Sequence, residues 1–149
     1  MKDAPDTPAE LKQRALRYLV RREHSRAELE RKLSPHADSS PAVEAVLDLL
    51  LSKKQQSDER FASERSRVLS RKYGPARIRQ DLKAKGVGDE VIDRLPLENE
   101  LERAGAILRK KFPLPAGSVE EKARRARFLQ GRGFSAEVVH RLVLRGEEA

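Results

Sequence analysis

Positive side chains gather in the stretch RKYGPARIRQDLKAKG, residues 71–86, and the chemistry that they could perform is the binding of phosphate groups or other anions. Ile78 and Leu82 keep the spacing of a buried helical face, so the cations should lie on the outward side of the same helix. Residues 65–85 hold eight cations and the single anion Asp81, a local charge of +7 within a chain of net charge +8. Like charges one turn apart repel, so a helix selected for stability alone would carry more acidic residues. We therefore predict contacts to an anionic partner through Arg71, Lys72, Tyr73, Arg77, Arg79, Lys83 and Lys85.

A second basic helix, residues 121–132, carries five cations against Glu121. We assign it to the same kind of surface, with Lys122, Arg124, Arg125, Arg127 and Arg132 as its contacts. The corner Tyr73-Gly74-Pro75 separates two helices: Gly74 can end the first in a left-handed conformation, and Pro75 can begin the second. Tyr73 would pack between the helices, touch the partner, or do both.

Catalytic chemistry finds little support in the sequence. The chain has no cysteine, and its three histidines have no ligand spacing, so we expect no metal site and place the histidines at the surface or its boundary. Carboxylates fall mostly in first turns of helices, where they favour the positive end of the helix dipole. No glycine-rich phosphate loop or nucleophile motif occurs. An enzyme using Asp89 and Asp93, spaced i, i+4, is a minor alternative; we predict no catalytic residue and no cofactor.

Composition bounds the class of protein. The 149 residues are 38% hydrophobic, 38% charged and 4% aromatic, which suits helices packed through Leu, Val, Ile and Ala. A charge of +8 and a pI near 10 imply attraction to polyanions, with nucleic acid as the first candidate. The absence of cysteine fits a reducing compartment, and no apolar run reaches 18 residues. We expect a soluble, monomeric protein of the cytoplasm that does not contact membranes.

The elements that position the cations are predicted to be helices arranged as three copies of one unit. The patterns AELERKL, ARIRQDL and ARRARFL begin at Ala27, Ala76 and Ala123, a period close to 48 residues. Each copy adds an apolar helix before this pattern and another helix after it. The predicted fold is all-α, with three tandem three-helix, helix-turn-helix-like repeats in an elongated, curved arrangement. Residues 1–9 would be a flexible tail, and the repeats would span residues 10–53, 54–97 and 98–149.

Capping signals mark the helix ends. Thr7 is predicted to be an N-cap, followed by a proline at the first helical position and Glu10 at the third. Capping boxes are predicted to start at Ser25 and Ser118, and further N-caps at Ser40 and Asp89. Gly86 and Gly133 are predicted to stop the second helix of the second and third copies. The first copy departs from this pattern, because Ala37 and Asp38 stand at the equivalent place.

The central stretch SDERFASERSRVLSRKYGPARIRQDLKAKGV, residues 57–87, closely resembles the middle repeat of the RecX family, regulators of the RecA recombinase. The stretches ALRYLVRREHSRAELERKL (residues 15–33) and EKARRARFLQGRGFSAEVV (residues 121–139) resemble its first and third repeats. The resemblance implies a non-catalytic protein that binds the RecA nucleoprotein filament along its groove. It also implies modulation, usually inhibition, of recombinase, ATPase and coprotease activity in DNA repair, recombination and the SOS response. Residues 71–85 and 122–132 would then face RecA or the phosphates of bound DNA.

A direct DNA-binding protein is the main alternative. In that case the helix-turn-helix units would dock on single- or double-stranded DNA, without sequence preference or through Arg77, Arg79 or Lys83 at the bases. The low aromatic content argues against stacking platforms for single strands, and the sequence carries no dimer signal.

Overall fold

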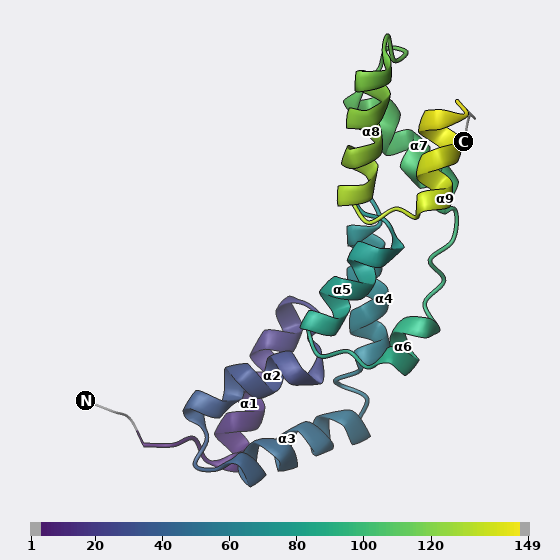
Figure 1. Cartoon of the computed structure of the whole chain (residues 1–149). Helices are drawn as coiled ribbons and strands as arrows, with labels where there is room; N and C mark the ends of the chain where they lie inside the picture. Colours follow the sequence, from purple (N-terminus) through teal and green to yellow (C-terminus); the bar gives the residue numbers. More distant parts are fainter. Residues whose placement is uncertain (1–3, 147–149) are drawn as a thin grey trace. The chain divides into compact units, whose positions relative to one another are not determined.

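The computed structural model describes residues 4–146, and all regular structure in that range is helical (Figure 1). The predicted all-α fold of three-helix repeats is confirmed. The first repeat holds α1 (Pro8–Arg21), α2 (Arg26–Leu33) and α3 (Ser40–Ser52), with the 3-10 turn η1 (Ser34–His36) after α2. The second holds α4 (Asp58–Leu69), α5 (Pro75–Ala84) and α6 (Asp89–Asp93). The third holds α7 (Glu100–Lys111), α8 (Val119–Gly131) and α9 (Ala136–Val139), which continues into the π-helical turn η2 (His140–Leu144).

The residues just before α1 contact the first repeat. Pro8 and Ala9 already belong to α1, two residues before the predicted boundary. Asp6 donates its backbone N–H to the carbonyl of His36, and its carboxylate accepts two hydrogen bonds from the guanidinium of Arg14, at 2.8 and 3.2 Å. Residues 1–3 of the predicted tail lie outside the described residues.

Capping boxes start the first two helices, one at the predicted N-cap Thr7 and one at the predicted box of Ser25. The Thr7 and Ser25 side chains each accept from the backbone of the third helical residue, Glu10 and Glu28, whose carboxylates accept from the cap backbone in return. These reciprocal bonds satisfy two N–H groups that a helix start leaves without a partner in the helix, so the residues before each helix fix where it begins.

Three other predicted helix starts differ in detail. Ser118 caps α8, but the carboxylate of Glu121 accepts from the N–H of Gly117 at 2.7 Å instead of closing a box. The cap of α3 is Ser39, one residue before the predicted Ser40. Asp89 is the first residue of α6, where its carboxylate favours the positive end of the helix dipole.

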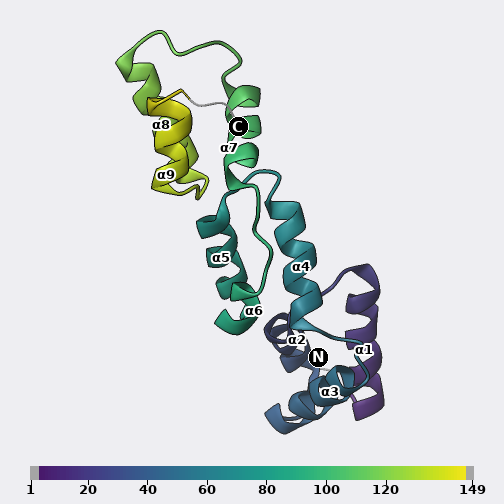
Figure 2. The ribbon, with the colours of Figure 1, turned by 90° about the vertical axis from the view of Figure 1, so that its right-hand side faces the viewer.

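The chain divides into two compact units, and each has its own buried residues. Unit 1 comprises Met1–Glu64 with Lys83–Asp93, and unit 2 comprises Arg65–Leu82 with Arg94–Ala149. In unit 1 the core lies between α1, α2 and α3 and consists of Leu11, Ala15, Leu29, Leu33, Val43, Val46, Leu47 and Leu50. In unit 2 one core cluster lies between α7, α8, α9 and η2 and consists of Ala104, Leu129, Phe134, Val138, Val139, Leu142 and Val143. Figure 2 shows α8 and α9 side by side, as does Figure 1.

The basic helix α5 has the orientation about its axis that the sequence predicts. Ile78 and Leu82 are both fully buried, whereas Arg77 and Lys83 on the same helix are exposed. Asp81 accepts two hydrogen bonds from the guanidinium of Arg65, at 2.9 and 3.0 Å, which ties α5 to α4. The following helix α6 is short and ends at Asp93, because Leu95 precedes Pro96 and a residue before proline disfavours the helical region.

A repeated junction between neighbouring repeats lies within each unit. In unit 1 the turn after α5 packs on the start of α2: Ser25 Oγ donates to the carbonyl of Lys85 at 2.6 Å. A Cβ placed on Gly86 would lie 2.3 Å from the Cβ of Ala27. In unit 2 the turn after α8 packs in the same way on the start of α5, because Gly74 donates its N–H to the carbonyl of Arg132 at 2.7 Å.

Glycine is required at these junctions for two reasons. Gly86 and Gly133, at the predicted helix stops, are left-handed, with φ of +84° and +90°. The left-handed expectation for Gly74 is wrong, because its φ is not positive. Gly74 is needed for space, since an added Cβ would lie 2.5 Å from the carbonyl oxygen of Gly133.

His24 is buried, contrary to the expectation that the histidines lie at the surface or its boundary. Only 2% of its surface is exposed, and its ring lies beside the ring of Tyr18. Lys32 Nζ donates to His24 Nε2 at 2.8 Å, while His24 Nδ1 donates to the carbonyl of Arg22 at 3.0 Å. Burial lowers the pKa of His24, opposed by the bond to the Arg22 carbonyl and reinforced by the charges of Arg22 and Lys32. The ring is therefore held neutral.

The stability of unit 1 is expected to decrease as the pH is lowered below about 6.5, the ordinary pKa of a histidine. Because the pKa of His24 is lowered in the folded chain, the unfolded chain binds a proton there more readily, so the free energy of unfolding decreases as the pH falls from 7 to 5. The limit for one proton is about 1.4 kcal/mol per pH unit. Urea denaturation at pH 5, 6 and 7 measures the slope, which His24→Gln should reduce. His140→Gln, at an exposed position, should retain it; an equal slope in His24→Gln and the unaltered protein would exclude His24 as its source.

Candidate anion-binding site

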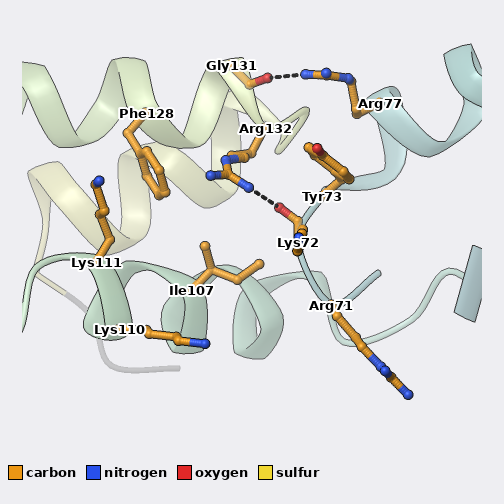
Figure 3. Close-up of a pocket in the computed structure, with 10 residues that line it drawn as sticks. All are labelled: Arg71, Lys72, Tyr73, Arg77, Ile107, Lys110, Lys111, Phe128, Gly131 and Arg132. Carbon is orange, nitrogen blue, oxygen red and sulfur yellow. Dashed lines mark hydrogen bonds between the residues drawn. The ribbon is translucent and has the colours of Figure 1, made fainter. Parts of the chain in front are cut away.

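Unit 2 contains a hollow of about 600 Å³ whose lining is strongly basic (Figure 3). Six of the ten residues that line it are cations, and none is a carboxylate. They come from the α4–α5 turn, from the first turn of α5, from the last turns of α7 and from the end of α8. We call this set the basic hollow: Arg71, Lys72, Tyr73, Arg77, Ile107, Lys110, Lys111, Phe128, Gly131 and Arg132.

Two arginines of the basic hollow are fixed in place by main-chain carbonyls. Arg77 Nη1 donates to the carbonyl of Gly131 at 3.0 Å, and Arg132 Nη1 donates to the carbonyl of Lys72 at 3.4 Å. The guanidinium of Arg77 also lies over Tyr73, 4.7 Å from the ring centroid, and that of Arg132 lies 5.5 Å from the same centroid. Figure 3 shows the Arg132 guanidinium between the rings of Phe128 and Tyr73, and its distance to the Phe128 centroid is 5.0 Å. These contacts hold both guanidiniums in place without pairing either with a carboxylate.

The turn that carries Arg71, Lys72 and Tyr73 is held by a third arginine. Arg103 Nη1 donates to the carbonyls of Ser70 and Tyr73, at 3.1 and 2.9 Å. Burial lowers the pKa of Arg103, while the charge of Glu100 opposes this. The carbonyl oxygens accept hydrogen bonds from this guanidinium but carry no net negative charge. Arg103 therefore adds to the positive potential of unit 2.

The structure brings together five of the twelve predicted contacts: Arg71, Lys72, Tyr73, Arg77 and Arg132. The rest of α5 does not line the basic hollow. Lys83 and Lys85 belong to unit 1, where Lys83 Nζ pairs with Asp89 at 3.2 Å. Arg79 is half-buried on α5.

The remaining predicted contacts lie on α8, and one of them is largely covered. Lys122, Arg124 and Arg127 are exposed. The side chain of Arg125 is only 12% exposed: its guanidinium lies 4.9 Å from the Phe112 ring centroid, and Nη2 donates to the carbonyl of Leu114 at 2.7 Å. Arg125 therefore fastens the loop between α7 and α8, a role that leaves little of it for a partner.

Sequence reasoning missed the contribution of α7 to the basic hollow. Lys110 and Lys111 end α7, in a run of three cations that was visible but fits the ordinary preference for positive charge at a helix C-terminus. Ile107 and Phe128 give the hollow an apolar part, and nothing in their local sequence distinguishes them from core positions. Only the packing of α7 against α8 identifies these residues as neighbours of Arg71 and Arg132.

Metal binding and membrane insertion find no support in residues 4–146. In that range no group of three or more His, Cys, Asp and Glu side chains lies close enough to hold a metal ion. No helix described in the structure has the length and apolar character needed to cross a bilayer.

Family models match the chain in three consecutive segments. Residues 12–50, 57–95 and 98–143 match the first, second and third three-helix domains of RecX. The chain belongs to the RecX family. It is 43% identical over 142 residues to the regulatory protein RecX of Ralstonia nicotianae, covering 93% of this chain and 89% of the relative. It is 47% identical over 136 residues to the regulatory protein RecX of Leptothrix cholodnii, covering 89% and 87%.

A solved structure of the family has the same fold. The crystal structure of RecX from Lactobacillus salivarius superposes with a TM-score of 0.80 at 20% identity, covering 93% of this chain and 95% of the other. RecX is a family of regulatory proteins, as the names of its members state, and not a family of enzymes.

Proposed function

We propose that this protein binds the RecA–DNA filament and inhibits the recombinase, ATPase and coprotease activities of RecA. The observation that carries the proposal is the match of three successive RecX domains to nearly the whole chain. The proposed setting is DNA repair, recombination and the SOS response in the cytoplasm, with the protein acting as a monomer.

The charge of the chain supports an anionic filament as the target. RecA filaments assemble on DNA, whose phosphates attract a protein of net charge +8. The exposed cations of the basic hollow and of α8 offer separate contact regions on one chain. Weak contacts joined in this way add through their high effective concentration, so a regulator could hold several RecA protomers at once.

We expect substoichiometric protein to inhibit ATP hydrolysis by RecA on single-stranded DNA. The measurement is the steady-state ATPase rate as the protein is titrated from well below one copy per RecA protomer. The salt concentration is set so that the protein alone does not coat the DNA, because phosphate contacts weaken steeply as salt rises. Inhibition at low ratios requires action on the filament, since too little protein is present to cover the DNA.

Direct DNA binding is the second candidate, favoured by the absence of any carboxylate among the residues that line the basic hollow. An unchanged ATPase rate, together with tight binding to naked DNA in the same buffer, would replace the RecA proposal with this one.

A further inference from the structure

We propose that the basic hollow is a binding site for an oligophosphate, a ligand with two or more directly linked phosphate groups, such as a nucleoside di- or triphosphate. The site would operate without RecA. Oligophosphate binding can therefore be measured on the protein alone, and it can fail while the proposed regulatory function stands.

The charge of the hollow is the first argument. Elsewhere in unit 2 arginines lie beside acids: Arg65 pairs with Asp81, and Arg124 with Glu121. The hollow instead collects six cations without a carboxylate in its lining. Like charges held close together repel, so this arrangement gains most from an anion that carries several charges in a small volume. Linked phosphates concentrate charge more densely than the phosphodiesters of a nucleic acid, where one phosphate is present for each nucleotide.

The geometry is the second argument. Arg77 and Arg132 are held by the carbonyls of Gly131 and Lys72 and by the ring of Tyr73, so little side-chain entropy is lost when their remaining N–H groups bind a phosphate. Rigid guanidiniums suit the paired oxygens of a phosphate group. Lys110 and Lys111 end α7 at the edge of the hollow, and their long side chains can adapt to a ligand (Figure 3).

The size and the apolar part of the hollow are the third argument. Its volume of about 600 Å³ falls in the range of small-molecule sites, roughly 300–1,000 Å³. Ile107 and the rings of Tyr73 and Phe128 line it together with the cations. A ligand that joins phosphates to a flat organic group, as a nucleotide does, would use both parts of this lining.

The variant that tests the site removes only cations without a structural role. Arg71, Lys110 and Lys111 are exposed, and within residues 4–146 their side chains form no hydrogen bond or ion pair. Arg71→Ala, Lys110→Ala and Lys111→Ala are combined in one protein. The matched control combines Arg21→Ala, Arg31→Ala and Lys53→Ala, three exposed cations of unit 1, so both proteins lose the same net charge.

The experiment is calorimetric titration of the full chain with tripolyphosphate, with a nucleoside triphosphate and with a short oligothymidylate, in about 0.15 M salt. We expect saturable binding of one tripolyphosphate per chain, weakened at least about tenfold in the hollow variant and within about twofold in the control. Amide NMR shifts on titration should concentrate at Lys72, Gly131 and Arg132 in the unaltered protein. Tighter binding of the nucleoside triphosphate than of tripolyphosphate would add the apolar lining to the recognition.

Three results would overturn the proposal. The first is the absence of saturable tripolyphosphate binding up to about 1 mM. The second is an equal loss of affinity in the hollow variant and the control, which would make net charge the only cause. The third is binding of oligothymidylate alone that depends on the hollow cations, which would make the hollow a contact for nucleic acid instead.

Discussion

Replacing Gly133 with alanine is expected to lower the free energy of unfolding of unit 2 by about 2–5 kcal/mol. Gly133 has φ of +90°, a conformation that costs an alanine about 1–2 kcal/mol. The new Cβ would also lie 2.5 Å from the backbone nitrogen of Arg77, too close for any real contact. Backbone atoms cannot swing aside as a side chain can, so the turn after α8 has to move away from the start of α5.

A glycine two residues earlier provides the matched control. Gly131 is the last residue of α8, and a Cβ there would meet no atom within 4 Å. Gly131→Ala should change stability by less than about 1 kcal/mol, because alanine favours helix and the position has open space. Urea denaturation followed by far-UV circular dichroism gives both values. Equal stability of the two variants would show that the junction at Gly133 is not tightly packed.

The same junction explains a departure that the sequence showed but did not account for. Gly86 and Gly133 each end the second helix of a repeat and pack on the repeat before it. Within residues 4–146 the equivalent turn of the first repeat, at Ala37 and Asp38, makes no such contact with another repeat, so no glycine is needed there. The repeat pattern in the sequence located Gly86 and Gly133 and showed that the first repeat lacks an equivalent glycine. The reason for this difference lies in contacts between segments that are more than 50 residues apart, which the pattern does not show.

The helices themselves could be predicted from local signals. Capping residues, a buried face of period 3.6 and glycine stops act within a few residues, which is why the burial of Ile78 and Leu82 followed from spacing alone. His24 could not be placed in this way. Its burial depends on contacts with Tyr18 on α1 and Lys32 on α2. A single histidine in a polar segment of sequence gives no sign of such neighbours.

For the candidate site, the sequence indicated the kinds of residue involved better than their arrangement in space. Charge counting found the region in which the basic hollow forms, because six cations of residues 71–85 and five of residues 122–132 stand out from the rest of the sequence. It could not distinguish Arg125, which fastens a loop, from the exposed cations beside it on α8. It also missed Lys110 and Lys111, since two lysines at a helix end have an adequate local explanation.

Charge reversal at the basic hollow is expected to raise the concentration of protein that half-inhibits the RecA ATPase by at least about tenfold. The variant combines Arg71→Glu, Lys110→Glu and Lys111→Glu. Arg77 and Lys83 are less suitable, because Arg77 holds the carbonyl of Gly131 and Lys83 pairs with Asp89, so their loss would also disturb the fold. The three chosen side chains are exposed, so the thermal unfolding midpoint should stay close to that of the unaltered protein.

A second reversal separates local contact from long-range attraction. Each substitution of a cation by glutamate changes the charge by two, so three of them take the chain from +8 to +2 wherever they are made. The control variant reverses Arg21, Arg31 and Lys53, exposed cations of unit 1. If the hollow contacts the filament, its reversal should weaken inhibition much more than the control does, and the difference should persist as salt screens the long-range term. Equal weakening of the two variants, vanishing together at higher salt, would mean that net charge attracts the protein and that the hollow makes no contact of its own.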